Sequence, residues 1–288
     1  MATIVDKREA APEDILIVCD FSPPRSTDPE TLNQAKKLTA DFISVAYNPG
    51  KSIRVNSTLG ALWIKNNTSK DVIFTLATRD MNKIAIQSLL LGANINGLEN
   101  VVIVKGDSFN TRELRTVTTV DDFRPTELIA SLSEMNKGLD YKGNKLHAPT
   151  HLCIGATIDL ANGLERELKL TRRKIEAGVQ FFLMQPVFEP NLVIDFMDAY
   201  HRSYGETIAN PIFCGIQVMV PKGIVFSNIP AWVKADIDKG RPGYEVASQI
   251  LENFVGTGLR SIYLVPPILR GGRRDYEAAQ RVIDTVRN

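Results

Sequence analysis

The chain has 288 residues, and its 34 Lys and Arg residues nearly balance 33 Asp and Glu residues, leaving a formal net charge of +1. This balance argues against a general nucleic-acid-binding protein, and a hydrophobic content of 44% argues against a disordered chain. The N-terminus has no apolar signal core, and no apolar run approaches the roughly 20 residues that span a bilayer. We therefore expect a soluble, cytoplasmic protein.

Eight short apolar runs recur along the chain, and most are followed by a polar loop and then by a helical pattern. The runs are continuous rather than alternating, which is typical of parallel strands covered by helices. The predicted strands are Ile15–Cys19, Phe42–Ala46, Val72–Leu76, Val101–Val104, His151–Ala156, Phe181–Met184, Ile212–Val218 and Ser261–Val265.

The intervening segments carry helical patterns with recognisable end signals. Asp28 and Asp80 stand where N-cap residues belong, and Gly178 is a natural C-terminal stop. The predicted helices are Pro29–Thr39, Met81–Ile95, Glu127–Met135, Leu164–Ala177, Leu192–Tyr200, Tyr244–Phe254 and Tyr276–Val286.

Eight strands with intervening helices predict an α/β fold, a (β/α)8 TIM barrel that forms a single domain over residues 1–288. The competing layout is an open doubly wound sheet, but no GxGxxG motif follows the first strand. GANING at Gly92–Gly97 lies at a helix end and lacks the Lys-Ser/Thr pair of a phosphate loop. We interpret the long irregular stretch Ser108–Pro125 as an active-site loop.

The cysteines and histidines show no pattern of a disulfide framework or a metal site. His147 and His151 are four residues apart, but a proline between them prevents a helical ligand pair, so we expect no metal. The sequence has neither a GxSxG motif nor a Cys-His arrangement, which argues against hydrolase chemistry. We expect buried, unreactive thiols at Cys19, Cys153 and Cys214.

In a barrel of this kind the chemistry belongs at the carboxyl ends of the strands. Asp20 and Asp107 place two carboxylates there, and a buried carboxyl group can act as a general acid. The alternative role is capping the next helix. That role is favoured for Asp28 and Asp80, but no helix begins close behind Asp20 or Asp107, so function is favoured for these two. Further polar residues at strand ends are Tyr47, Thr75, Lys105, Thr157, Gln185 and Gln217.

Five segments, in this order along nearly the whole chain, resemble the methylenetetrahydrofolate reductase family. The similarity is closest to the subgroup that also occurs fused behind homocysteine methyltransferase domains. The segments are DFSPPRSTDPE from Asp20, FISVAYNP from Phe42, TLATRDMNKIAIQSLLLGANINGLENVVIVKGD over Thr75–Asp107, KIEAGVQFFLMQPVFEP over Lys174–Pro190 and SIYLVPP from Ser261.

The resemblance implies a flavin-dependent barrel enzyme of one-carbon and methionine metabolism. FAD lies across the barrel mouth in this family, NADH or NADPH reduces it, and the folate then takes the place of the nicotinamide. The reduced flavin passes a hydride to the one-carbon bridge of 5,10-methylenetetrahydrofolate and yields 5-methyltetrahydrofolate. The bridge must first open to an iminium ion, which requires a general acid.

The same resemblance assigns roles to individual residues. Asp20 stands where the family has its general acid, Asp107 matches the family's Gly-Asp motif, and Gln185 matches a glutamine that contacts folate. Gln217 is a second expected substrate contact. Glu167 and Lys174 lie two turns apart on one helix face, although a solvated charged face is the alternative for Glu167. The expected FAD positions are Tyr47, Thr75, Lys105, Gly106, Asp107, Ala156, Thr157, Glu167 and Lys174.

Three features depart from the family pattern. Asp20 replaces a residue that is usually Glu, Thr75 stands where many members have His, and residues 215–232 look shorter, with most of a helix missing. The third departure leaves the electron donor open. The alternatives are a relative that uses a protein donor or works in the oxidative direction, and a non-catalytic flavin- or folate-binding partner of a methyltransferase. The near-neutral charge permits self-association, and we expect a homo-oligomer.

Overall fold

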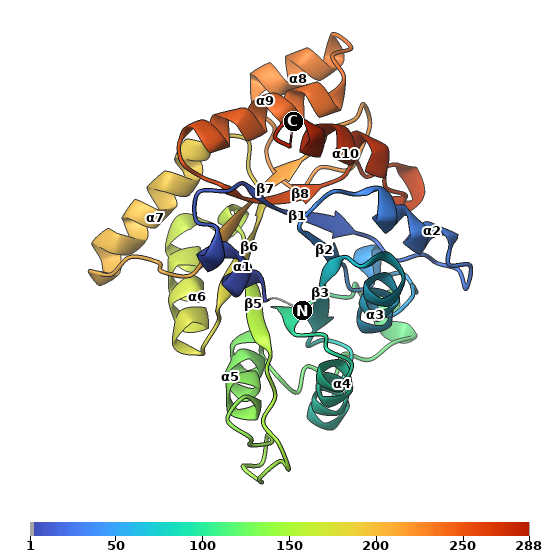
Figure 1. The fold of residues 1–288 in the computed structure, drawn as a ribbon, viewed down its shortest axis with the longest axis vertical. Helices are drawn as coiled ribbons and strands as arrows, with labels where there is room; N and C mark the ends of the chain where they lie inside the picture. The colour runs from blue at the N-terminus through green and yellow to red at the C-terminus, as the bar shows by residue number, and fades with distance from the viewer. Residues whose placement is uncertain (1–2, 288) are drawn as a thin grey trace.

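Eight parallel strands close into a barrel in the order in which they occur along the chain, and helices surround it (Figure 1). The computed structural model describes residues 3–287. The predicted TIM barrel is confirmed, and every predicted strand is present within two residues of its expected ends. The strands are β1 Leu16–Phe21, β2 Phe42–Val45, β3 Asp71–Ala77, β4 Asn100–Val104, β5 Cys153–Ile158, β6 Phe181–Pro186, β7 Ile212–Gln217 and β8 Ser261–Val265.

Alternation along each strand divides the core into two layers. Leu16 and Val18 of β1 point into the barrel with the other interior side chains, whereas Ile17 and Cys19 pack outward against the helices. The interior is tightly filled, because a Cβ atom built on Gly155 would lie 2.3 Å from a ring atom of Phe181. The same alternation turns the last inward residue of each strand toward the carboxyl mouth.

The helices over Ile4–Ala10, Ser57–Thr68 and Ala231–Asp238 were not predicted, and two predicted helix starts differ from the structure. Asp80 does not cap the helix that follows β3, because Asn82 accepts the Ala85 N–H instead. Asp28 accepts the Glu30 N–H, but the expected helix after it breaks into a short α-helix and a 3-10 turn. The helices are α1 Ile4–Ala10, α2 Glu30–Asn33, α3 Ser57–Thr68, α4 Lys83–Ile95, α5 Pro125–Met135, α6 Leu164–Glu176, α7 Pro190–Tyr204, α8 Ala231–Asp238, α9 Gly243–Gly256 and α10 Tyr276–Asp284.

The short N-terminal helix α1 closes the amino end of the barrel. Its Ile4 side chain is fully buried and belongs to the interior cluster with Leu16 and Phe42. The Ile4 backbone N–H donates to the Asn100 side chain at 2.9 Å, at the start of β4. This end is therefore filled by packing, and the opposite, carboxyl end is left for loops and polar groups.

Candidate active site

The carboxyl end of β1 carries a buried ion pair. One oxygen of Asp20 accepts from the Tyr263 hydroxyl at 2.9 Å, and the other accepts from Arg274 Nη2 at 3.0 Å. The Asp20 and Arg274 side chains are 7% and 6% exposed. Burial, followed by the charge of Asp20, raises the pKa of Tyr263 well above its usual value, so this phenol stays protonated. Asp20 thus lies at the barrel mouth as expected, with a donor on each oxygen.

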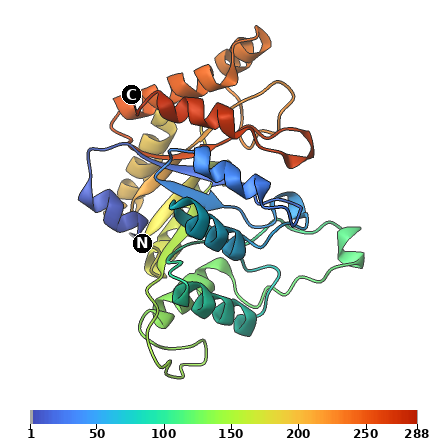
Figure 2. The same cartoon turned by 45° about the vertical axis from the view of Figure 1, so that its right-hand side comes forward.

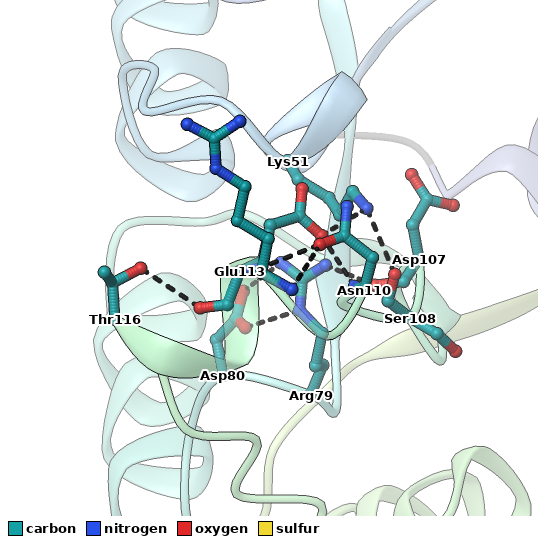
Figure 3. Close-up of polar contacts among 9 residues, drawn as sticks. Lys51, Arg79, Asp80, Asp107, Ser108, Asn110, Glu113 and Thr116 are labelled. Carbon is teal, nitrogen blue, oxygen red and sulfur yellow. Dashed lines mark hydrogen bonds and ion pairs between the residues drawn. The ribbon is translucent and has the colours of Figure 1, made fainter.

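A second polar cluster follows β3 (Figure 3). Arg79 binds Asp80 through two nitrogens at 2.6 and 2.7 Å, and a third nitrogen donates to the Asp107 backbone carbonyl at 2.6 Å. Burial alone would raise the pKa of Asp80, but hydrogen bonds from Arg79 and Tyr47 outweigh it and lower the pKa. Burial and the nearby Asp80 raise the pKa of Tyr47 to about 12. The role of Asp80 is therefore to hold Arg79, and the capping prediction for it is wrong.

The segment after β4 extends beyond the barrel in Figure 2, and side chains that follow β2 and β3 contact it. Lys51 Nζ lies 2.7 Å from Glu113 Oε2 and donates to the Ser108 carbonyl at 3.2 Å. The Arg79 guanidinium lies 4.1 Å from the centroid of the Phe109 ring. The predicted long loop is present, and contacts from two neighbouring strand ends position it beside Asp107 (Figure 3).

Helix α6 brings a buried charge pair to the end of β5. Lys174 Nζ donates to the Thr157 carbonyl at 2.6 Å and lies 3.2 Å from Glu167 Oε1, whose side chain is 1% exposed. The second Glu167 oxygen accepts from Asn162 at 3.0 Å. The solvated-face alternative for Glu167 is therefore wrong, because the side chain is buried and each carboxylate oxygen accepts a hydrogen bond.

Two glutamines extend the mouth across β6 and β7. Gln185 is half-buried and lines a groove of about 390 Å³ with Phe188 and Ser227 among its walls. Gln217 is 2% exposed, and its amide is held by backbone groups of the following segment, the Ile224 carbonyl at 2.7 Å and the Phe226 N–H at 3.2 Å. Gln185 is therefore accessible, whereas contact between Gln217 and a substrate requires that segment to move.

The remaining predicted cofactor residues lie along neighbouring strand ends with different exposure. Thr75 is half-buried and points inward, and its carbonyl accepts from the Ser57 hydroxyl at 2.7 Å. Lys105 is exposed after β4, and Gly106 adopts a φ of +88°, a conformation that favours glycine. Ala156 is buried in the outer core, so its side chain faces the helices rather than the mouth. The strand ends thus bring Thr75, Lys105 and Gly106 to the mouth.

Sequence reasoning missed the basic partners of this site. Lys51 and Arg79 hold the loop after β4, and Arg274 binds Asp20 across a separation of 254 residues. The tripeptide Thr-Arg-Asp directly after β3 was a usable signal for Arg79, because a charged residue at that strand end must face the mouth. Nothing in the local sequence marks Arg274, which becomes significant only when β1 and β8 meet.

Residues 3–287 contain neither a metal-ligand cluster nor a membrane-spanning helix. No group of three or more His, Cys, Asp or Glu side chains there is placed to hold a metal ion, and no helix in this range has the length and apolarity needed to cross a membrane. Cys19, Cys153 and Cys214 are buried free thiols, as predicted. Burial raises the pKa of Cys153 and of Cys214 to about 12, so these two sulfurs stay protonated and weakly nucleophilic.

An α/β barrel with a polar carboxyl mouth defines a class of barrel enzymes and ligand-binding proteins. Within that class, the sequence profile described as methylenetetrahydrofolate reductase matches residues 6–239. The chain belongs to the methylenetetrahydrofolate reductase family. A comparison with curated proteins found no match.

Solved structures of similar fold cover nearly the whole chain at low sequence identity. One is an uncharacterized protein from Clostridium thermocellum that binds two copies of 5-methyl-5,6,7,8-tetrahydrofolic acid, with 12% identity, a TM-score of 0.66, and coverage of 99% of this chain and 98% of that one. Another is 2,3-dimethylmalate lyase of the PEP mutase/isocitrate lyase superfamily, with 12% identity, a TM-score of 0.52, and coverage of 92% and 81%. At this identity the likeness concerns the fold.

Proposed function

We propose that the chain binds FAD and a reduced folate at the carboxyl mouth and reduces 5,10-methylenetetrahydrofolate to 5-methyltetrahydrofolate. The observation that carries the proposal is the row of polar groups along β3, β4, β5 and α6, at positions where the family resemblance puts cofactor contacts. The folate part is supported further by the Clostridium thermocellum protein, which has the same fold and binds 5-methyl-5,6,7,8-tetrahydrofolic acid.

The donor set of the mouth suits a hydroxylated cofactor that carries phosphates. Lys174 uses two of its three ammonium hydrogens on Thr157 and Glu167, which leaves one for a further acceptor. Lys105 is an exposed cation two residues before Asp107 in the loop after β4. In this proposal Lys174 and Lys105 bind the anionic part of FAD, and the cofactor supplies hydride chemistry when bound.

Gln185 and Asp20 are the proposed folate contacts. Gln185 has both a donor and an acceptor to offer from the wall of its groove, which suits the edge of a pterin. Asp20 is the proposed source of the proton that opens the one-carbon bridge. Its carboxyl group must take up that proton while Tyr263 and Arg274 remain beside it.

The ion pair of Asp20 with Arg274 favours a second candidate, a folate-binding barrel without reductase activity. An ion-paired carboxylate serves binding and stability without giving up a proton. Both candidates place folate in the same mouth, and they differ in whether reduced flavin is oxidised by the methylene substrate.

An anaerobic absorption experiment tests both candidates. We expect a yellow protein whose flavin, once reduced by dithionite, is reoxidised by 5,10-methylenetetrahydrofolate. A yellow protein that NADH and NADPH reduce much more slowly than dithionite would indicate a protein donor, and this is the outcome we expect from the irregular segment after β7. A colourless protein that binds 5-methyltetrahydrofolate would support the second candidate and contradict the reductase.

A further inference from the structure

A cavity of about 330 Å³ lies beside the carboxyl ends of β1 and β8, and its walls are strongly basic. Four separate segments form it: the Ser-Pro-Pro-Arg stretch after β1, the region of α2, the loop before α3, and the Gly-Gly-Arg-Arg stretch after β8. Among the described residues that line the cavity there is no Asp or Glu. The basic residues that line it are Arg25, Arg54, Arg273 and Arg274.

Two buried side chains in the cavity wall have unused hydrogen-bonding atoms. Arg274 is 6% exposed and gives one nitrogen to Asp20, but its Nε and Nη1 have no partner within residues 3–287. The Ser22 hydroxyl, on a residue that is 4% exposed, also has no partner there. Buried donors without partners are costly, and most are satisfied in folded proteins. Both groups would be satisfied by an acceptor inside the cavity.

Arg54 adds a second guanidinium whose charge is not balanced locally. Its Nη1 donates to the Pro23 carbonyl at 2.9 Å, and its Nε has no partner in the described part of the chain. Burial, followed by the positive charges of Arg274 and Arg25, lowers the pKa of Arg54. The cluster therefore repels itself in the absence of an anion, and a negative ligand would relieve that repulsion.

We propose that this cavity is a binding site for an oxyanion ligand that carries two or more negative charges, of the phosphate or carboxylate type. Guanidinium groups bind both kinds of oxyanion through paired, charge-assisted hydrogen bonds. Arg54 and Arg274 supply donors without partners, Ser22 supplies a hydroxyl, and the exposed Arg25 supplies charge. The site does not depend on the proposed reductase activity, because the cavity and its arginines are present whatever the barrel mouth binds.

Arg274 connects this anion site to the barrel mouth. The same guanidinium that faces the cavity also binds Asp20 at 3.0 Å. An anion that binds Nε and Nη1 would compete with Asp20 for the charge of Arg274. Binding of an anion in the cavity is therefore expected to weaken the ion pair of Asp20, the carboxylate that the proposed reaction uses.

Calorimetric titration tests the site with two defined probes, inorganic pyrophosphate and a triglutamate peptide, at constant ionic strength set with KCl. We expect saturable one-to-one binding of at least one probe, and the preferred probe distinguishes a phosphate from a carboxylate ligand. Arg54→Gln and Arg25→Gln should each weaken it by about tenfold or more, since each removes a charge-assisted contact. Arg202→Gln on α7, an exposed arginine outside the cavity, is the control with the same change in charge.

The outcomes distinguish specific anion binding in the cavity from nonspecific attraction of anions to the basic surface. Loss of binding in Arg25→Gln with retention in Arg202→Gln supports the site even if Arg54→Gln fails to fold. The Arg25 side chain is exposed, and within residues 3–287 it makes no hydrogen bond or ion pair that its removal would break. Equal weakening in Arg25→Gln and Arg202→Gln overturns the proposal, and so does the absence of saturable binding for both probes in the folded protein.

Discussion

The substitution Asp20→Asn removes the negative charge from a buried ion pair and leaves the shape of the side chain nearly unchanged. Arg274, 6% exposed, then keeps a charge without its carboxylate, in addition to two nitrogens that already lack partners. At 3.0 Å and an effective dielectric constant of about 20, the lost attraction is roughly 5 kcal/mol before desolvation is considered. Breaking a buried pair in this way destabilises proteins by about 3 to 5 kcal/mol.

The expected result is a lower melting temperature and a selective loss of chemistry. At roughly 2 °C per kcal/mol for a chain of this size, Asp20→Asn should melt about 6 to 10 °C below the wild type. Oxidation of the reduced flavin by methylenetetrahydrofolate should fall about 100-fold or more, as the loss of a general acid requires, while flavin binding and reduction persist. Circular dichroism follows the melting, and anaerobic stopped-flow absorbance follows the flavin.

A matched control variant and two possible outcomes test the role of Asp20. Asp28→Asn removes the same charge from an exposed side chain and should melt within about 1 °C of the wild type. Unchanged stability in Asp20→Asn would show that the ion pair with Arg274 contributes nothing. Reduced stability with intact folate turnover would remove Asp20 as the acid and leave it a structural residue.

Three further predictions concern the rest of the barrel. Lys174→Met should destabilise the protein in urea by about 3 kcal/mol and reduce retained flavin, because it leaves buried Glu167 unpaired; adding Glu167→Gln should recover part of the stability but not the flavin. Gly155→Ala puts a Cβ 2.3 Å from a buried ring and should cost about 2 kcal/mol or more, whereas Gly92→Ala, with open space, should be neutral or stabilising. The pKa of Asp80 is lowered in the folded protein, so its ion pair stabilises the fold above about pH 4, and this stabilisation is lost as the pH falls through the folded-state pKa. Asp80→Asn should therefore lower the free energy of unfolding at pH 7 and make it decline less steeply toward pH 2, as urea titrations would measure.

The strand pattern was predictable because burial on both sides makes parallel strands continuously apolar. Runs such as Val101–Val104 can therefore be recognised in the sequence, and eight such runs together indicate a closed barrel. Helix ends were less predictable, because several polar residues compete for each cap. Asp80 and Asn82 both precede α4. Asp80 pairs with its sequence neighbour Arg79, and Asn82 becomes the cap.

In the candidate site, contacts between residues close in sequence were also predictable, whereas contacts between distant residues were not. Glu167 and Lys174 lie on one helix face, so their proximity follows from helical periodicity alone. The ion pair between Asp20 and Arg274 joins opposite ends of the chain, and no spacing rule reports it. Sequence could place Asp20 at the mouth, whereas its charged partner depends on β1 pairing with β8.

The segment over residues 218–230 lies where both the electron donor and the folate are proposed to approach the barrel mouth. It forms neither helix nor strand, and backbone groups at Ile224 and Phe226 occupy the amide of Gln217. Its first turn is held in place by close packing, because a Cβ on Gly243 would lie 1.6 Å from the Met219 carbonyl oxygen. The stretch beyond Met219 is more exposed, with Phe226 48% exposed. If that stretch opens, it frees Gln217 for a substrate and uncovers the same side of the mouth for a donor, so one motion would serve both half-reactions in turn.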